Sequence, residues 1–313
     1  MSGIKRREFM ALSAGVSAMA ASAANSVTAQ SLDASSLDSS GLVVCMHGIT
    51  SDGFDFRTTM EGWARAGIVA VEPDLVKARE FETANGPGSA RKLLDDLGQS
   101  AFSSTNQLFL DEDSEQRAAA IESLKWKVEL AVSLGADRLV IPSTASQPHT
   151  LADYARLQEN LFEAAEIARP YDFALMLEFT RNSRLVNNLR TSLDVVRTLN
   201  HPNLKFMLDL YHFWAGPSKF EDLDLVRPGE IHHVHFADTP RQPPLEVAEQ
   251  KDRAFPGEGV APLQKILNKL AELGYNRALS LELFDPVVRS TDPQVIAAKG
   301  LQTITPFIDG VGA

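Results

Sequence analysis

The sequence predicts an α/β protein with a single (β/α)8 barrel. Eight short apolar runs alternate with helix-like segments between residue 42 and the C-terminal region. The runs are almost continuously apolar, as expected for parallel strands that are buried on both faces. A chain of 313 residues has room for such a barrel, which takes about 250 residues.

The individual elements follow from composition and spacing. Residues 114–136 are predicted to form a helix that begins after the capping Ser114 and ends at Gly135, and residues 150–170 and 261–275 show similar helical spacing. A doubly wound open sheet is the competing topology, but no glycine-rich dinucleotide or phosphate loop follows the first strand. The predicted strands are residues 42–48, 68–74, 101–109, 137–143, 173–179, 204–211, 231–237 and 278–284.

The N-terminal residues have the composition of an export signal. Arg6 and Arg7 are followed by Glu-Phe-Met and then by an uncharged stretch with small residues, which resembles the twin-arginine signal. A generic secretory leader is the alternative. We expect a bacterial protein exported to the periplasm, with a signal peptide at 1–29, a flexible Ser/Asp-rich linker at 30–40 and the barrel at 41–313.

The overall charge and the cysteine content limit the classes of partner. The formal net charge is −11, so a phosphate backbone would be repelled and a nucleic-acid partner is disfavoured. No apolar run reaches the length of a membrane span. Cys45 is the single cysteine, so no intramolecular disulfide can form, and its apolar neighbours predict a buried strand residue.

Metal-binding residue types stand at the carboxyl ends of the last four predicted strands, where a (β/α)8 barrel places its active site. At the mouth of a closed barrel three carboxylates would repel one another, and a divalent cation between them would remove that repulsion. Three oxygen donors and one imidazole suit Mn²⁺ first, with Mg²⁺ or Co²⁺ as alternatives and Zn²⁺ less typical. The four predicted ligands are Glu178, Asp209, His235 and Glu282.

The strand-seven segment IHHVHFAD carries two further histidines beside His235. Because side chains alternate along a strand, His233 shares the face of His235 and His232 points the other way. We expect His233 to lie in the core or to support the metal ligand, and His232 to pack outward.

Several motifs of the second half carry a family resemblance. They are LMLEF, FMLDLYHF, HVHFADT, KDRAFPGEGV and LSLELFDP. With them, roughly residues 42–310 resemble the xylose isomerase-like TIM barrels, the sugar phosphate isomerase/epimerase group. Within that group the likeness is to the inosose (2-keto-myo-inositol) isomerases, whose loop after strand seven has a similar pattern.

The resemblance implies roles for individual residues. It places the family's metal ligands on the four residues named above and implies substrate contacts for His212 and Arg241. Arg184 stands where the ketose epimerases have an acidic residue, and this departure argues against a ketose 3-epimerase activity.

Other residues are expected around the pocket on weaker grounds. Glu72 and Asn106 match residues of the family on strands two and three, whereas His47 ends strand one where the inosose isomerases have a glutamate. Lining of the pocket is one expectation for these three residues, and capping or structural hydrogen bonding is the alternative. Trp214 follows His212 and is a candidate wall against a sugar face, while Arg253 lies in a Gly/Pro-rich loop over the barrel mouth and is a candidate substrate contact.

The predicted chemistry is proton transfer next to a carbonyl. A metal would stabilise the enediolate of an α-hydroxyketone, while Glu178 and Glu282 remove and return the proton. This predicts a divalent-metal-dependent isomerase or epimerase of a keto-sugar or keto-cyclitol, which export favours as non-phosphorylated. The alternative is a lyase or dehydratase that uses the same site for β-elimination on a 3-keto-glycoside or keto-inositol.

Two further classes are less favoured. A non-catalytic periplasmic sugar-binding protein would not need two opposed carboxylates. A DNA-repair nuclease of a related type is opposed by the acidic charge, by the export signal and by the shortage of further histidines for a multi-zinc cluster.

Overall fold

The computed structural model describes residues 41–105, 115–145 and 150–312. The predicted signal peptide, the linker and Asn106 lie outside the described residues. One eight-stranded sheet has the order β3-β2-β1-β8-β7-β6-β5-β4, and all its pairings are parallel. Its strands are β1 (Val43–His47), β2 (Ala70–Glu72), β3 (Ser100–Ala101), β4 (Arg138–Pro142), β5 (Ala174–Glu178), β6 (Leu204–Asp209), β7 (Ile231–His235) and β8 (Ala278–Leu281).

The sheet closes into a barrel between β3 and β4. Beyond β3 the chain continues to Thr105, which forms a parallel bridge with Val140 of β4. The backbone N–H of Val140 donates to the carbonyl of Ser104 at 2.7 Å. The predicted single (β/α)8 TIM barrel is therefore confirmed.

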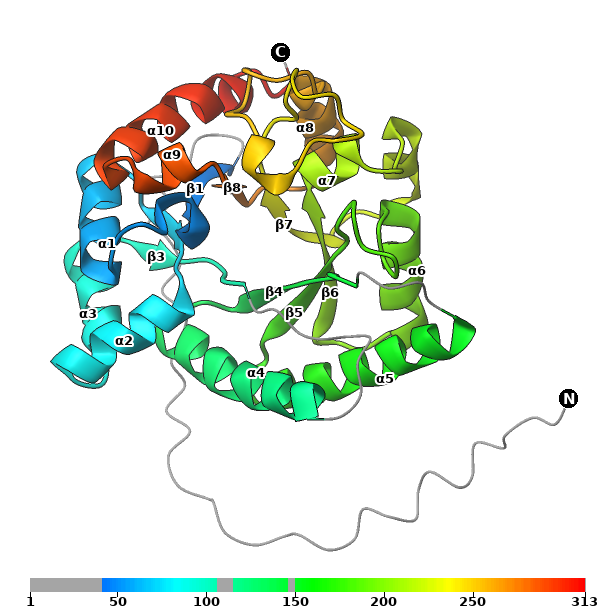
Figure 1. Cartoon of the computed structure of the whole chain (residues 1–313), viewed down its shortest axis with the longest axis horizontal. Coiled ribbons are helices and arrows are strands. Elements are labelled where there is room, and N and C mark those ends of the chain that lie inside the picture. The colour runs from blue at the N-terminus through cyan, green and yellow to red at the C-terminus, as the bar shows by residue number, and fades with distance from the viewer. Residues whose placement is uncertain (1–40, 106–114, 146–149, 313) are drawn as a thin grey trace, which may run out of the picture. The chain divides into compact units, whose positions relative to one another are not determined.

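Helices surround the strands (Figure 1). No helix in the described part of the chain has both the length and the hydropathy of a membrane span. The α-helices are α1 (Phe56–Arg65), α2 (Leu75–Asn85), α3 (Ser89–Asp96), α4 (Glu115–Ser133), α5 (Leu151–Ala168), α6 (Leu189–Leu199), α7 (Leu210–Ala215), α8 (Leu263–Glu272), α9 (Pro286–Ser290) and α10 (Pro293–Asp309). The 3-10 helices are η2 (Gly48–Ser51), η3 (Arg169–Tyr171), η4 (Phe220–Leu225) and η5 (Gln250–Asp252).

The predicted elements are present with small shifts at their ends. Helix α5 begins after Thr150, whose backbone N–H donates to Asp153 at 2.7 Å in a capping box. Strand β6 ends at Asp209 because its carboxylate caps α7 by accepting the N–H of His212 at 2.7 Å. The predicted third strand is the least regular, since only Ser100 and Ala101 form β3.

The side chains that point into the barrel change from apolar to polar along the strand direction. Side chains alternate along each strand, so every second residue enters the interior. One step further toward the carboxyl ends, the same alternation brings in His47, Glu72, Glu178, Asp209 and His235. Below the polar residues, the barrel interior is therefore filled by buried apolar side chains. They are Val43, Cys45, Ala70 and Ala278 in one cluster and Val140, Met176 and Met207 in another.

Candidate active site

Four side chains of the types that bind metals meet at the carboxyl ends of consecutive strands. Glu178, Asp209 and His235 are the last residues of β5, β6 and β7, and Glu282 directly follows β8. One donor atom from each lies within 4.8 Å of the others, and all four residues are buried. The barrel therefore brings together the ligand set that the sequence predicts.

The donor atoms of this cluster fit a cation. The Nδ1 atom of His235 lies 3.4 Å from Oε1 of Glu178, 3.6 Å from Oδ2 of Asp209 and 3.2 Å from Oε2 of Glu282. Both Nδ1 of His235 and Oε1 of Glu178 are buried without a hydrogen-bond partner among the described residues. Buried polar atoms of this kind normally have a partner, and a divalent ion bound by three carboxylates and one imidazole would supply it.

His235 has a second carboxylate on the opposite edge of its ring. Its Nε2 atom lies 3.3 Å from Oε2 of Glu72. That same oxygen accepts hydrogen bonds from Nε2 of His233 at 2.9 Å and from Oγ of Ser280 at 2.8 Å. Glu72 is 0% exposed, so it lies beneath the cluster, and His233 is buried in the core, as expected.

The carboxylates of the cluster titrate differently. Burial raises the pKa of Glu178 to about 7, and the charges of Glu282 and Asp209 add to this effect. Burial also opposes ionisation of Glu282, but His235 and Arg253 outweigh it and lower the pKa of Glu282 to about 2. The metal-free site therefore contains one carboxylate that takes up a proton near neutrality and one that stays ionised.

Arg253 supplies a positive charge next to the carboxylates of the cluster. Although it lies in the loop over the barrel mouth, only 4% of it is exposed. Its Nη1 donates to Oδ2 of Asp209 at 2.6 Å and to Oε2 of Glu282 at 2.8 Å. Its guanidinium also stacks near the rings of Tyr211 and Phe284, 4.8 and 5.0 Å from their centroids. Arg253 is thus a buried part of the cluster rather than a group on an exposed rim.

Asp238 holds the loop that carries Arg253, and sequence reasoning missed it. Its Oδ2 accepts the N–H groups of Gly257 and Gly259 at 3.0 Å each, and its Oδ1 accepts that of Ala261 at 3.0 Å. Its backbone also pairs with Ala254 in an antiparallel bridge. Three loop residues therefore depend on this carboxylate, and a fourth, Ala254, pairs with the backbone of the same residue.

His212 is buried beside the metal cluster. Its Nε2 lies 3.1 Å from Nη2 of Arg253 and 3.2 Å from Nε2 of Gln250, and its Nδ1 accepts the N–H of Arg181 at 3.2 Å. Burial lowers the pKa of His212 to about 4, although Asp209 opposes the shift. At neutral pH it is therefore an uncharged imidazole facing the cavity.

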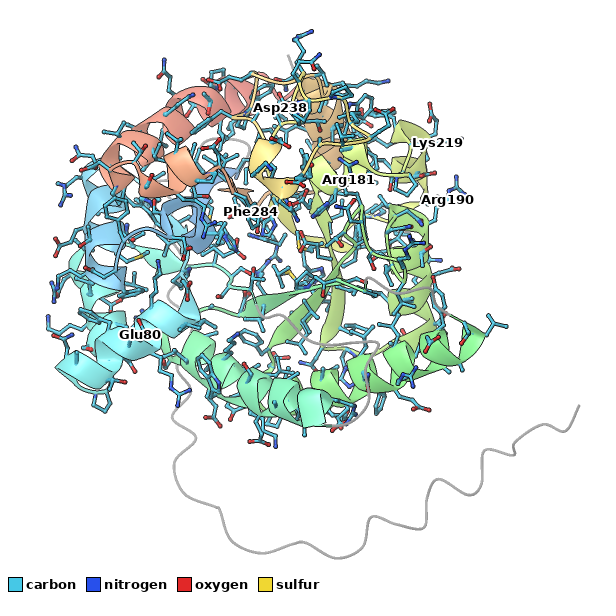
Figure 2. The ribbon with its side chains drawn as sticks, viewed as in Figure 1. Glu80, Arg181, Arg190, Lys219, Asp238 and Phe284 are labelled. Atoms are coloured by element: carbon cyan, nitrogen blue, oxygen red, sulfur yellow. The ribbon has the colours of Figure 1, made fainter. Side chains whose placement is uncertain are left out.

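The site opens into a cavity of about 540 Å³. Glu178, Glu282, His212, Arg253 and His47 line it. Asn182, Thr180, Ser183, Ser104 and Thr105 add polar groups, and Ile49, Leu75, Val76, Pro142, Ala145 and Phe284 add apolar ones. Figure 2 labels Phe284 beside the central opening of the barrel. A cavity of this size accommodates a sugar-sized ligand with room to spare.

Not every residue predicted for the pocket lies there. His47 does, with its Nε2 2.9 Å from Oγ1 of Thr105 and 3.7 Å from Oε1 of Glu282. Glu72 lies below the cavity. Arg241 is exposed in the loop after β7 and is outside the cavity lining. Trp214 is half-buried against the hydrophobic core instead of the cavity.

His232 also has the position that alternation predicts. Its side chain lies on the other side of β7 and borders a separate groove near the N-terminal ends of β6 and β7. Its Nδ1 lies 3.2 Å from the carbonyl of Glu230.

Residues 61–306 match the model of the xylose isomerase-like TIM barrel family. The chain belongs to this family. The expected family is thereby confirmed, and the four strand-end residues form the one buried Glu-Asp-His-Glu group found among the described residues.

Individual members of the family are similar to this chain over part or most of its length. An inosose isomerase of Bacillus licheniformis is 31% identical over 181 residues, which are 57% of this chain and 65% of that protein, so the match spans less than two thirds of the relative. A 3-dehydroshikimate dehydratase of Pseudomonas aeruginosa is 29% identical over 254 residues, 78% of this chain and 38% of that protein.

A solved structure of the IOLI protein with a binding zinc atom has the same fold. It superposes with a TM-score of 0.79 at 22% identity and covers 85% of this chain and 98% of that one. The likeness establishes the barrel for this member of the xylose isomerase-like family.

Proposed function

We propose that this protein is a divalent-metal-dependent isomerase or epimerase of a keto-sugar or keto-cyclitol. The observation that carries the proposal is the pair Glu178 and Glu282. Both line one cavity, and both lie within 3.4 Å of the Nδ1 atom of His235. Two carboxylates that reach one substrate cavity from different strands can act as a paired base and acid.

Different residues of the site would bind the metal, transfer the proton and orient the substrate. A divalent ion held by Glu178, Asp209, His235 and Glu282 would act as a Lewis acid on the carbonyl of a bound α-hydroxyketone. One of the two glutamates takes the proton from the α-carbon, and the other delivers a proton to the neighbouring carbon or to the opposite face of the same carbon. The neutral His212 offers a hydrogen bond to a substrate hydroxyl.

Hydrogen exchange tests this proposal. The metal-loaded protein is incubated in D₂O with 2-keto-myo-inositol and with ketohexoses, and the products are analysed by NMR and mass spectrometry. We expect deuterium at the carbon next to the carbonyl and an isomer of otherwise unchanged mass. E178Q and E282Q should each abolish the exchange, whereas E80Q, an exposed residue of α2, should leave it intact. Exchange that persists in both active-site variants would contradict the assignment.

A lyase or dehydratase activity is the second candidate. The similarity to a 3-dehydroshikimate dehydratase over 78% of this chain supports it. The same proton abstraction leads to elimination when a leaving group lies β to the carbonyl. Loss of water from 3-dehydroshikimate, or of the aglycone from a 3-keto-glucoside, would favour this reaction over isomerisation.

We also propose Mn²⁺ as the metal, because carboxylate oxygens supply three of the four donors. The zinc atom of the IOLI structure makes Zn²⁺ the main competitor. Metal analysis of protein purified without added metal, followed by activity after reconstitution with Mn²⁺, Mg²⁺, Co²⁺ or Zn²⁺, tests the choice. Highest activity with Zn²⁺ would contradict it.

Export by the twin-arginine route is a further proposal and is supported by Arg6 and Arg7 alone. Replacing both arginines by lysine should retain the protein in the cytoplasm, as shown by cell fractionation. Unchanged export would indicate a generic secretory leader.

A further inference from the structure

The cavity has two walls of different character. On one wall, Glu178 comes from β5, His212 from α7, Glu282 from the residue after β8 and Arg253 from the loop after β7. A second part of the lining comes from the segment after β2 and from the end of β4 beside β5, together with α2 and α4. There the lining consists of Asp74, Leu75, Val76, Lys127, Pro142, Thr144 and Ala145.

Lys127 is the cation of this second wall. It lies in α4, is half-buried and lines the same cavity as Glu178 and Glu282. Among the described residues its ammonium group has no hydrogen-bond or ion-pair partner within 4.0 Å. Its Nζ lies 5.5 Å from the centroid of the Trp126 ring, near the limit of a cation–π contact.

The other cation in the described lining is already engaged. Arg253 donates to Asp209 and Glu282 and contacts His212, so its charge balances the metal cluster. Asp74 is near enough to Lys127 to raise its pKa, although burial lowers it overall. However, Oδ1 of Asp74 already accepts the N–H groups of Val76 and Lys77 as the cap of α2.

We propose that Lys127 binds a carboxylate on the substrate, at the end of the cavity away from the reacting carbons. The inference rests on the proposed function and narrows its substrate class to acidic keto-sugars or keto-cyclitols, such as a keto-uronate. Because Lys127 is partly buried, its ammonium group attracts an anion more strongly than a fully exposed lysine would. A carboxylate suits the site better than a phosphate because a single lysine faces it, with no second free cation in the described lining.

Three ketohexoses that differ only at C6 provide the test. They are D-fructose, D-fructuronate and D-fructose 6-phosphate, which present a hydroxyl, a carboxylate and a phosphate. Dissociation constants are measured by calorimetry with the metal-loaded full chain, for the wild type and for K127M, K127R and K125M. Lys125 is the matched control because it lies two residues away in α4, with its side chain 48% exposed and paired with Glu122 at 2.6 Å.

The wild type should bind D-fructuronate about tenfold or more tightly than D-fructose, as expected for a hydrogen bond to a charged group. K127M should remove this preference without changing the affinity for D-fructose, K127R should retain part of it, and K125M should retain all of it. The preference should also weaken as ionic strength rises.

Several outcomes would overturn the inference. Equal binding of D-fructose and D-fructuronate by the wild type would do so, as would tighter binding of the phosphate than of the carboxylate. An equal loss of affinity for all three sugars in K127M, or a loss of stability with unchanged affinities, would show that Lys127 only balances Asp74. The proposed function fails separately, if neither these sugars nor 2-keto-myo-inositol exchanges its α-hydrogen, and the inference then falls with it.

Discussion

Glu72 and His235 meet inside the barrel, with Oε2 of the carboxylate 3.3 Å from Nε2 of the imidazole. The opposite ring nitrogen, Nδ1, faces Glu178, Asp209 and Glu282. His235 therefore lies between the single carboxylate of Glu72 and the three carboxylates of the cluster. The carboxylate of Glu72 favours the proton on Nε2, and this leaves the Nδ1 lone pair directed at the cluster. Carboxylates behind metal-binding histidines orient the ring and increase its basicity in this way.

The first prediction concerns this carboxylate. E72Q keeps the shape of the side chain but removes its charge, so we expect metal affinity to fall about 10-fold to 100-fold. Calorimetric titration of the metal-free protein with Mn²⁺ measures the effect without reference to catalysis. E80Q on the surface of α2 should bind metal like the wild type. Equal affinities for E72Q and the wild type would show that Glu72 has no influence on the ligand.

The second prediction concerns Arg253. R253M removes the cation that contacts Asp209 and Glu282, so the metal-free protein should lose about 3 kcal/mol of stability, as expected when one partner of a buried pair is deleted. A bound divalent ion should recover most of the loss because it neutralises the same carboxylates. Urea unfolding with and without Mn²⁺ measures both effects.

The control for this variant is K92M. Lys92 pairs with Asp96 at 2.7 Å, and the two side chains are 73% and 58% exposed, so its removal should cost less than about 1 kcal/mol. If R253M were no less stable than K92M in the metal-free state, the buried charge balance described above would be wrong.

The third prediction is a pH dependence of the metal-free protein. Burial raises the pKa of Glu178 to about 7. Burial opposes the charge on His235, but Glu282 and Glu72 outweigh it and raise the pKa of His235 well above its usual range. Groups whose pKa is raised in the folded state bind extra protons there, so stability falls as pH rises through the shifted values.

The pH range in which this dependence should be measured lies between about pH 7 and about pH 8.5. At lower pH, His212 and His233 act in the opposite sense because burial lowers their pKa values. In this window the melting temperature of the metal-free protein should fall. The stabilisation by Mn²⁺ should increase, since metal binding releases the protons of Glu178 and His235. A melting temperature of the metal-free protein that rises over the same window would contradict the charge assignments.

The sequence predicts correctly that Glu178, Asp209, His235 and Glu282 meet, because the barrel topology alone brings these strand ends together. The carboxyl ends of parallel strands converge in a closed barrel, so a polar residue at each strand end reaches the mouth wherever the helices lie. The alternation of side chains also separates His233 from His232 without further information. These inferences require only the strand positions.

Residues in loops and short helices could not be placed in the same way. Arg241 and Trp214 follow strands, but their orientation depends on how the chain turns. The alternation of side chains that holds along a strand does not continue into a turn. The burial of Arg253 depends on Asp238, whose carboxylate binds backbone groups about twenty residues later in the chain. Gly259 is the sequence signal that this loop approaches another backbone closely.

The last prediction tests that loop. A Cβ atom at Gly259 would lie within 3.0 Å of the carbonyl oxygen of Thr239 and of the carboxylate of Asp238. G259A should therefore push the loop away from Asp238 and displace Arg253, and we expect catalytic turnover to fall at least about tenfold because an active site tolerates little misplacement of its groups. The control is G229A, where the φ of +80° adds backbone strain but no atom lies within 4 Å of the added Cβ. If both variants unfold at similar urea concentrations but only G259A loses turnover, the loop positions Arg253. Full activity in G259A would show that the loop and Asp238 have no such role.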